Sequence, residues 1–256
     1  MAIRRWRWCL LILLGMVGWA CAAPQAVLLY NYYDAPPFIT VPGEGLSYAL
    51  ATHLNTIAHE RYQFTVVRIP RRRLNLLIEQ NGGSWVVAWA NPVWFGDAPR
   101  QRYFWSEPLL QDRDWWLSRR DHPLDPAALP TANGLILGGL LGHRYVDLDD
   151  AVAAGRIKRY DALDYPSSMH MLAAGRVDFI TIPDSVLGSL RHQYAQLLAR
   201  MQTAPRGEPY TRFLFSPRSD PALAAFVHDA VQQLTRDPDW QAEVAHWRGN
   251  DVVAHP

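Results

Sequence analysis

Cysteine is scarce in this chain, and both cysteines lie close to its start. Cys9 and Cys21 are the only two among 256 residues. If a segment up to Ala22 is removed, the remaining chain has no thiol for catalysis and no disulfide. Its stability must then come from packing, and thiol chemistry is excluded from its function.

The chain also lacks an excess of basic residues. Its 25 lysines and arginines face 24 acidic residues, for a formal net charge of +1. Three of the arginines, Arg4, Arg5 and Arg7, lie in the N-terminal segment, so removal of that segment reduces the basic residues from 25 to 22. A nucleic-acid-binding protein normally shows the opposite balance. We therefore expect no nucleic-acid partner.

Metal-binding and catalytic patterns are missing as well. Among nine histidines, neither His53 and His59 nor His143 and His170 form a recognised metal-ligand pair. We find no nucleophile with a base and no paired carboxylates at a convincing spacing. We therefore expect no metal, no cofactor and no enzymatic activity, although Glu107 and His143 would make an acid–base pair if the fold joined them.

The N-terminal segment contains one apolar run, which is short. It covers residues 9 to 19, follows three arginines and precedes the small residues 20–22. These are the three regions of a secretory signal peptide over residues 1–22, and the run is too short to span a bilayer. We expect cleavage after residue 22 and a soluble protein in an exported compartment, the periplasm. An uncleaved anchor stays open as an alternative, as does a lipid on Cys21, although Gly18 stands where lipoprotein signals usually have a bulky aliphatic residue.

Beyond this segment, apolar strands and amphipathic helices alternate. The pattern predicts strands at 26–30, 64–67 and 85–90, with helices at 46–59 and 71–80 between them. This order predicts a parallel α/β sheet, whose ligands bind at the loops beyond the carboxyl ends of the strands. Tyr33 and Trp94 follow the first and third strands, so they should lie near the same edge.

The loop after the third strand has the composition of a binding site. It carries Trp94, Phe95, Arg100 and Arg102. Arginine binds carboxylates with two hydrogen bonds and aromatic rings cover apolar surface, so the loop would suit a small polar or anionic solute. The alternative is a surface loop whose rings merely cap the core.

A second basic cluster opens the predicted helix at 71–80. It consists of Arg68 with Arg71, Arg72 and Arg73. At a helix start in a nearly neutral protein, such a cluster is typical of a solvated face. We therefore expect these side chains to face water, and a binding role for Arg73 alone stays open as an alternative.

Several motifs follow one another in a characteristic order. The first half has Pro36-Pro37-Phe38, Gly45-Leu46, Arg100, and Trp105-Ser106-Glu107-Pro108-Leu109. The second half has a Gly-rich turn at 138–145 and a Gly-Arg-Val-Asp turn at 175–178. In this order the motifs resemble those of the bacterial extracellular solute-binding proteins of family 3, the periplasmic amino-acid-binding type. The resemblance spans roughly residues 26 to 248.

The resemblance implies an α/β protein with the two-lobed type II periplasmic-binding fold. Each lobe would be a sheet flanked by helices, and two strands, at 114–118 and 213–215, would form the hinge. We expect the first part of lobe 1 at residues 24–117, lobe 2 at 118–212, and a return to lobe 1 with C-terminal helices at 213–256. Two lobes joined in this way can close over a ligand, and we expect a monomer.

The family's ligand-binding positions map onto this sequence with departures. Arg100 stands at the family's carboxylate-binding arginine, but its spacing to the Trp-Ser pair is one residue short, so Arg102 is a rival. Arg144 is the charged residue of the Gly-rich turn. The aspartate that clamps an α-amino group in the family would fall at Pro183, with Asp184 one position late. An amino-acid ligand is therefore less well supported than binding itself.

Together these residues favour a ligand with an anionic group and a flat or apolar part. We expect Arg100 and Arg144 to face each other across the cleft and hold the anionic group, with Tyr33, Trp94 and Phe95 against the body of the ligand. The implied function is capture of a small polar or anionic solute, such as an amino acid or related carboxylate, for an ABC-type importer. The alternatives are a ligand-sensing protein that acts on a membrane receptor and a dehydratase-like enzyme on the same fold.

Overall fold

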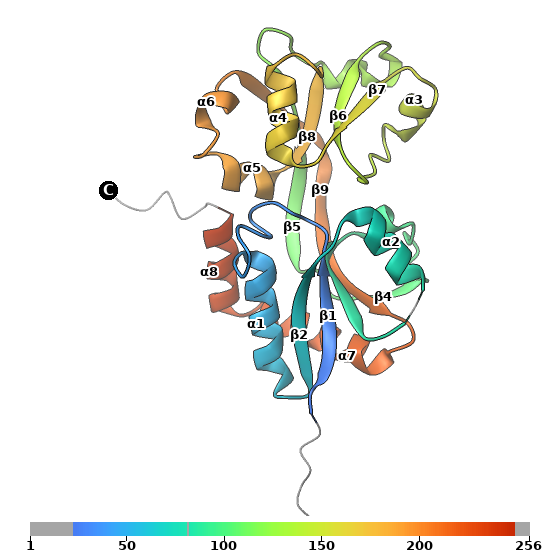
Figure 1. Ribbon diagram of the computed structural model, residues 1–256, viewed down its shortest axis with the longest axis vertical. Helices are drawn as coiled ribbons and strands as arrows, with labels where there is room; N and C mark the ends of the chain where they lie inside the picture. Colours follow the sequence, from blue (N-terminus) through green and yellow to red (C-terminus); the bar gives the residue numbers. More distant parts are fainter. Residues whose placement is uncertain (1–22, 81, 249–256) are drawn as a thin grey trace, which may run out of the picture.

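The computed structural model describes residues 23–80 and 82–248. The signal peptide predicted at 1–22 and the possible lipid site at Cys21 lie outside the described residues. Two bodies of strands and helices lie one above the other, and two long strands run between them (Figure 1). The predicted α/β architecture with two lobes is therefore confirmed.

The first lobe is built around a parallel core of three strands. In chain order it contains β1 (Gln25–Asn31), α1 (Leu46–Ala58), β2 (Tyr62–Arg68), α2 (Arg71–Glu79), β3 (Trp85–Ala90), the 3₁₀ helix η1 (Pro92–Phe95) and β4 (Tyr103–Trp105). β1 pairs in parallel with both β2 and β3. Helices α7 (Pro221–Leu234) and α8 (Pro238–Trp247) return to this lobe at the end of the described chain (Figure 1).

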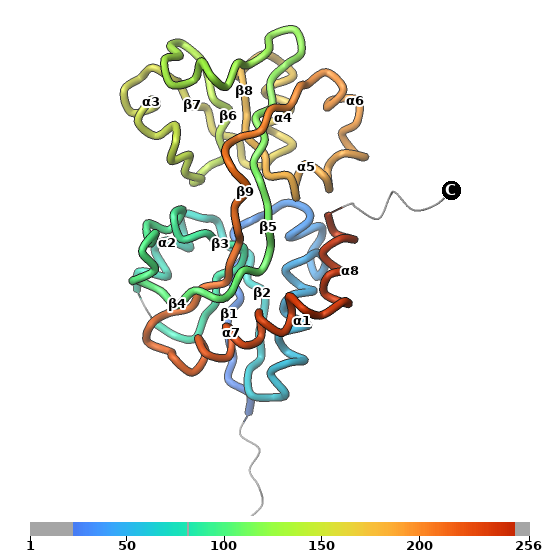
Figure 2. Tube along the Cα trace, turned by 180° about the vertical axis from the view of Figure 1, so that it is seen from behind, coloured from blue at the N-terminus to red at the C-terminus, as the bar shows by residue number. Residues whose placement is uncertain are grey.

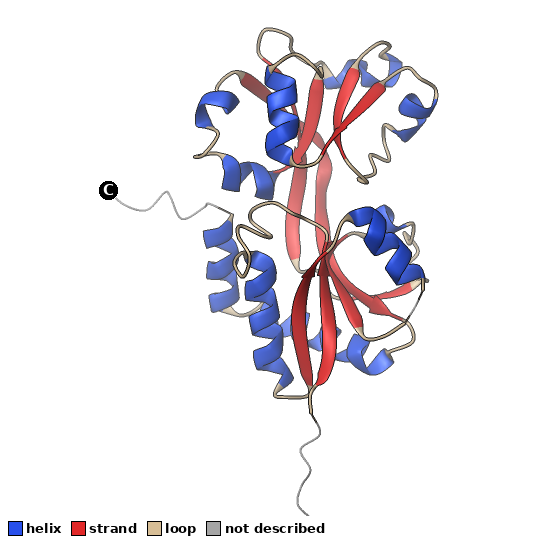
Figure 3. Cartoon of the chain, in the orientation of Figure 1, coloured by secondary structure: helices blue, strands red, loops and turns tan. Residues whose placement is uncertain are grey.

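The second lobe repeats the arrangement with shorter elements. It contains the 3₁₀ helix η2 (Pro126–Thr131), β6 (Ile136–Leu140), α3 (Asp149–Ala153), β7 (Lys158–Ala162), α4 (Tyr165–Ala173), β8 (Phe179–Pro183), α5 (Asp184–Leu190) and α6 (Ala195–Leu198). β6 pairs in parallel with β7 and β8. In both lobes helices flank the sheet (Figure 3).

Two antiparallel strands join the lobes. They are β5 (Leu110–Arg119) and β9 (Met201–Pro217), which lie side by side along the molecule (Figure 2). The strand order β2-β1-β3-β9-β5-β8-β6-β7 places this pair at the centre of the sheet. The expected domain boundaries at residues 118 and 213 both fall inside these strands, and the division of the chain into lobes at those positions stays a prediction.

The core follows from the apolar pattern of the sequence. All six residues of β3 are buried, as expected for a strand of a sheet covered on both faces. Along α1, Leu46, Leu50 and Leu54 recur at helical spacing and are fully buried. None of the described helices is long and apolar enough to cross a membrane.

Strand β9 differs most from expectation. The sequence predicts only a short strand at 213–215, yet β9 has 17 residues. Pro205 and Pro209 lie in its first half, and prolines are normally excluded from central strands. Pro205 nevertheless stands opposite Trp115 of β5 in the register of the pair.

Candidate ligand-binding cleft

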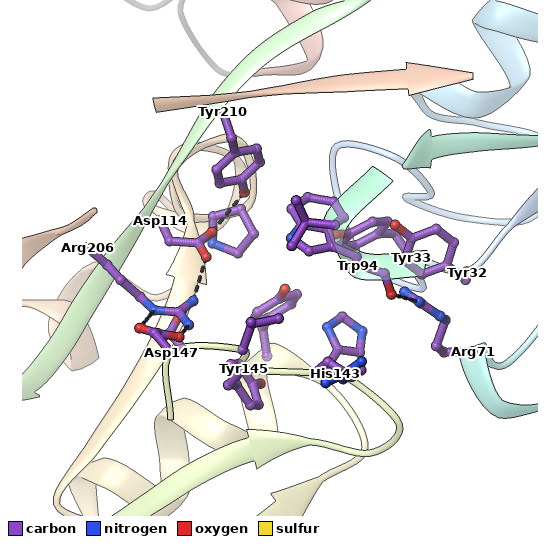
Figure 4. A pocket seen from close by; sticks show the side chains of 16 residues that line it. Tyr32, Tyr33, Arg71, Trp94, Asp114, His143, Tyr145, Asp147, Arg206 and Tyr210 are labelled. Atoms are coloured by element: carbon purple, nitrogen blue, oxygen red, sulfur yellow. Dashed lines mark hydrogen bonds and ion pairs between the residues drawn. The ribbon is translucent and has the colours of Figure 1, made fainter. Parts of the chain in front are cut away.

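A cavity of about 330 Å³ lies between the lobes, beside the two connecting strands. Its walls come from both lobes and from β5 and β9 (Figure 4). The lining residues are Tyr32, Tyr33, Arg71, Val93, Trp94, Asp114, His143, Arg144, Tyr145, Val146, Asp147, Tyr165, Thr181, Pro183, Arg206 and Tyr210. A solute in this cavity would therefore contact both lobes at once.

The cavity lies where the sheet topology predicts a site. Tyr32 and Tyr33 follow β1, Trp94 follows β3, and the segment 143–147 follows β6. Loops beyond the carboxyl ends of parallel strands carry the ligand sites of open α/β sheets. The expectation that Tyr33 and Trp94 share one edge is met, since both line this cavity.

A cluster of charged side chains forms the wall nearest the connecting strands. Arg206 of β9 donates to Asp114 of β5, with 2.7 Å between Nη1 and Oδ2, and also pairs with Asp147 of lobe 2. The hydroxyl of Tyr210 donates to the other oxygen of Asp114 at 2.8 Å. Burial raises the pKa of Asp114, although Arg206 and this hydrogen bond oppose the rise. Arg206 is therefore already neutralised by two carboxylates.

A fully buried ion pair lies behind this wall. Arg212 of β9 and Asp112 of β5 are both almost inaccessible to solvent, with 2.9 Å between Nε and Oδ2. Arg212 also donates to the hydroxyl of Tyr33 at 2.7 Å, and Asp112 accepts from the hydroxyl of Ser185 at 2.6 Å. The pair therefore connects a cavity residue of lobe 1 with the start of α5 in lobe 2.

Arg71 corrects the expectation that the basic cluster at 71–73 faces water. Its side chain is buried, donates to the carbonyl oxygen of Trp94 at 2.5 Å, and lies 3.8 Å from the centre of the Phe95 ring. Because α2 begins at Arg71, this first side chain faces η1, whereas Arg72 and Arg73 are exposed. The solvated-face prediction is wrong for Arg71, which lines the cavity.

His143 extends from lobe 2 towards the aromatic residues of lobe 1. Its ring centre is 5.8 Å from that of Tyr33 and 6.4 Å from that of Tyr32. Partial burial in the cleft, together with the charges of Arg71 and Arg212, lowers the pKa of His143 to about 3. The imidazole is therefore neutral near pH 7, with one nitrogen that donates and one that accepts a hydrogen bond.

The Gly-rich turn before His143 is fixed in place by its own contacts. Gly142 has φ +83°, and a Cβ there would lie 3.2 Å from Cγ of Arg72 in α2. Arg159 donates to the carbonyl oxygens of Leu140 and His143, both at 2.9 Å. Only glycine adopts this backbone without strain so close to the opposite lobe.

Three of the predicted site residues line the cavity, and three do not. Tyr33, Trp94 and Arg144 line it. Arg144 also pairs with Asp149, with 2.9 Å between Nη2 and Oδ2. Phe95 lies behind the wall, with Arg71 over its ring and Phe215 at 4.8 Å.

Arg100 does not face Arg144, which corrects the predicted anion clamp. Its guanidinium lies over the ring of Phe213 at 4.5 Å, and the side chain is exposed. The rival Arg102 donates weakly to the carbonyl oxygen of Phe95 at 3.4 Å and does not line the cavity either.

The carboxylate of Asp97 explains why both arginines lie outside the cavity. It accepts hydrogen bonds from the backbone N–H groups of residues 101, 102 and 103 and so folds the loop into a compact turn. Burial opposes ionisation of Asp97, yet these hydrogen bonds and one from the Trp105 indole hold its pKa below the usual value.

Asp184 also lies away from the cavity. It accepts from the indole of Trp115 at 2.8 Å and lies 3.7 Å from Arg248, at the end of α8. Its neighbour Pro183 lines the cavity instead. The expected clamp for an α-amino group is therefore not assembled by Asp184.

Most of the residues that line the cavity were not among the predicted site residues. Tyr210 and Arg206 lie in the part of β9 for which the sequence predicts no strand, and Asp114 lies in a predicted hinge strand to which no binding role was given. The only signal in the sequence for these residues was the alternation of residues along β5 and β9.

Glu107 lies 3.7 Å from His228, so the acid–base pair considered for Glu107 and His143 is not formed. Among the described residues, no group of three or more His, Asp or Glu side chains could hold a metal ion.

Comparison with known proteins gives the fold. No protein-family model and no curated protein matches the sequence. A structure from work on glutathione import in Gram-positive bacteria via GshT and the cystine ABC importer TcyBC of Streptococcus mutans is similar with a TM-score of 0.71 and 12% identity, over 88% of this chain and 95% of that one. The substrate-binding protein of an amino acid ABC transporter gives a TM-score of 0.67 and 14% identity, over 87% and 98%. An ancestral amino-acid-binding protein, a precursor of cyclohexadienyl dehydratase, gives 0.64 and 14%, over 88% and 95%.

These similarities extend over most of each chain. The fold of this protein is therefore the two-lobed periplasmic-binding fold, in which a two-strand hinge joins two sheets flanked by helices.

Proposed function

We propose that this chain is a periplasmic solute-binding protein that captures a small polar solute between its lobes for an ABC-type importer. The observation that supports this best is the origin of the cavity walls. Tyr33 and Trp94 come from lobe 1, His143 and Asp147 from lobe 2, and Asp114 from a connecting strand. A ligand that contacts both lobes stabilises their closed arrangement, so binding and closure are coupled.

The charges of the cavity favour an anionic group on the ligand. Three arginines and two aspartates line it, but Arg206 is occupied by Asp114 and Asp147. Arg144 pairs with Asp149, whereas Arg71 has no carboxylate partner among the described residues. Arg71 is therefore the cation most available to a carboxylate or another anion. The rings of Tyr32, Tyr33, Trp94 and Tyr210 would cover a flat or apolar part of the ligand.

The importer, the compartment and the monomeric state are proposed by analogy and from the sequence. Similar solved structures are described as parts of glutathione import and of an amino acid ABC transporter, and the N-terminal 22 residues have the pattern of a signal peptide. We propose a binding rather than a catalytic role, because the one acid–base pair suggested by the sequence, Glu107 with His143, is not assembled.

A thermal-shift screen of the chain from residue 23 onward tests this function. The panel should contain amino acids, organic acids, polyamines and small phosphoesters. A true ligand at a hundredfold excess over its Kd adds about 2.7 kcal/mol to the free energy of unfolding. We expect at least one anionic compound to raise the melting temperature in wild type and to do so less in Trp94→Ala. Failure of every compound to raise it, or turnover of the ligand that does, would contradict the proposal.

A further inference from the structure

A second cavity, of about 500 Å³, adjoins the first. Tyr32, Tyr33, Arg71, His143 and Tyr165 line both, so these five side chains stand between two chambers of one cleft. From these chambers we infer that the ligand is a dipeptide-sized solute, with its charged end in the first chamber and an apolar side chain in the second. This inference rests on the proposed function and specifies the substrate class of the same cleft.

The second chamber extends away from the connecting strands. Its walls include Asn31 at the end of β1, Arg68 at the end of β2, Leu140 at the end of β6, and Leu163 just after β7. In the strand order, β2, β1, β6 and β7 lie outside the central pair β9 and β5. An elongated ligand would therefore extend from the hinge outward along the cleft.

The second chamber has more aliphatic residues in its walls than the first, in which these are Val93, Val146 and Pro183. The first holds the ion-paired cluster of Arg206, Asp114 and Asp147. The second has the ion pair of Arg68 with Asp34 at its wall, together with six aliphatic residues: Ala35, Ile69, Pro70, Leu140, Leu141 and Leu163. A ligand with one charged end and one apolar end matches this difference.

Two of these leucines are unusually exposed for side chains of their size. Leu163 is 84% exposed and Leu141 is 52% exposed. Exposed apolar groups gathered at a cavity are typical of ligand-binding surfaces. An apolar side chain of the ligand would cover both of them in the bound state.

The residues between the chambers can bind a peptide bond. The neutral imidazole of His143 has one donor and one acceptor, and the hydroxyl of Tyr165 can donate or accept. Within residues 23–80 and 82–248, neither side chain makes a hydrogen bond to the protein. An amide that passes from one chamber to the other would satisfy its N–H and C=O groups here.

Isothermal titration with matched probes tests the inference. For X equal to glutamate, glutamine, arginine and alanine, the dipeptides X-Leu and Leu-X are compared with X-Gly, Gly-X and free X. Full burial of one leucine side chain is worth about a tenfold or greater gain in affinity. We expect at least one leucine dipeptide to bind about tenfold tighter than its glycine analogue and than free X.

Variants at the chamber wall complete the test. Leu163→Asn should remove most of this gain, and it should lower the affinity for the leucine dipeptide more than that for the glycine dipeptide. Leu76→Asn is the matched control, because Leu76 is 63% exposed on α2 and lines neither chamber. Equal affinities for the leucine and glycine dipeptides, or a gain that persists in Leu163→Asn, would overturn the inference and leave the proposed function standing. Binding of no probe, together with a negative thermal-shift screen, would overturn both.

Discussion

The guanidinium of Arg212 donates a hydrogen bond to the hydroxyl of Tyr33, with 2.7 Å between Nη1 and Oη. Arg212 lies in a strand that joins the lobes, whereas Tyr33 lines the proposed ligand cavity of lobe 1. The same guanidinium pairs with Asp112 of the other connecting strand. The position of a cavity wall is therefore fixed by the buried charges of the hinge.

Replacement of Arg212 should strongly destabilise the protein. Arg212→Met leaves the buried carboxylate of Asp112 without its partner, and breaking a buried ion pair on one side costs about 3 to 5 kcal/mol. Urea denaturation measures this loss in the free energy of unfolding. The double variant Arg212→Met with Asp112→Asn should recover part of it, because no uncompensated charge is then buried. A loss below about 1 kcal/mol in the single variant would contradict this role.

Stability should fall as the pH drops below neutral, and His143 should account for part of the fall. The imidazole takes up a proton near pH 6.5 in the unfolded chain but only near pH 3 in the folded protein. Between these values the unfolded chain binds more protons, so the stability present above pH 6.5 is lost as the pH falls. The contribution amounts to about 1 kcal/mol between pH 7 and pH 5.5.

Urea denaturation at these two pH values tests the assignment. His143→Gln should remove about 1 kcal/mol of the pH dependence. An unaltered slope in His143→Gln would show that folding does not lower the pKa of His143.

Replacement of Arg71 should weaken ligand binding, whereas replacement of Arg100 should not. Arg71 lines the cavity and Arg100 lies over Phe213, outside it. Arg71→Gln should weaken the binding of an anionic ligand at least about tenfold, since a charged hydrogen bond is worth roughly 1.5 to 3 kcal/mol. Arg100→Gln should bind with unchanged affinity in the same titration, and circular dichroism confirms that both variants fold. A loss of affinity in Arg100→Gln with none in Arg71→Gln would instead support the anion clamp expected from the family resemblance.

Local patterns in the sequence were sufficient to predict much of the fold. The apolar run at 85–90 corresponds to β3, and the helical spacing from Leu46 corresponds to α1. In both elements the buried residues are the apolar ones that the sequence pattern indicates. The residues of the site were harder to predict, because Arg71 is buried by contacts with Trp94 and with the ring of Tyr32, both remote in sequence.

The failure at Arg100 has a different cause. The motif spacing placed an arginine at the family's position, but the Asp97 carboxylate folds this loop around its own backbone hydrogen bonds. Arg206 was missed because the prolines of β9 are typical of loops, and only pairing with β5 keeps that segment extended. At Arg206 a tertiary contact outweighed the local pattern, whereas at Arg100 a carboxylate of the same loop did so.

The central claim is that a solute binds between the lobes and draws them together. It is tested most directly by the distance between spin labels on the two lobes, at Leu76→Cys in α2 and Tyr160→Cys in β7, both exposed positions. The chain beyond residue 22 has no cysteine of its own, so labelling is specific, and the pair Leu76→Cys with Leu28→Cys within lobe 1 is the control. Saturating ligand should shorten and narrow the interlobe distances and leave the control distances unchanged. An interlobe distribution that is the same with and without a saturating ligand would contradict the account.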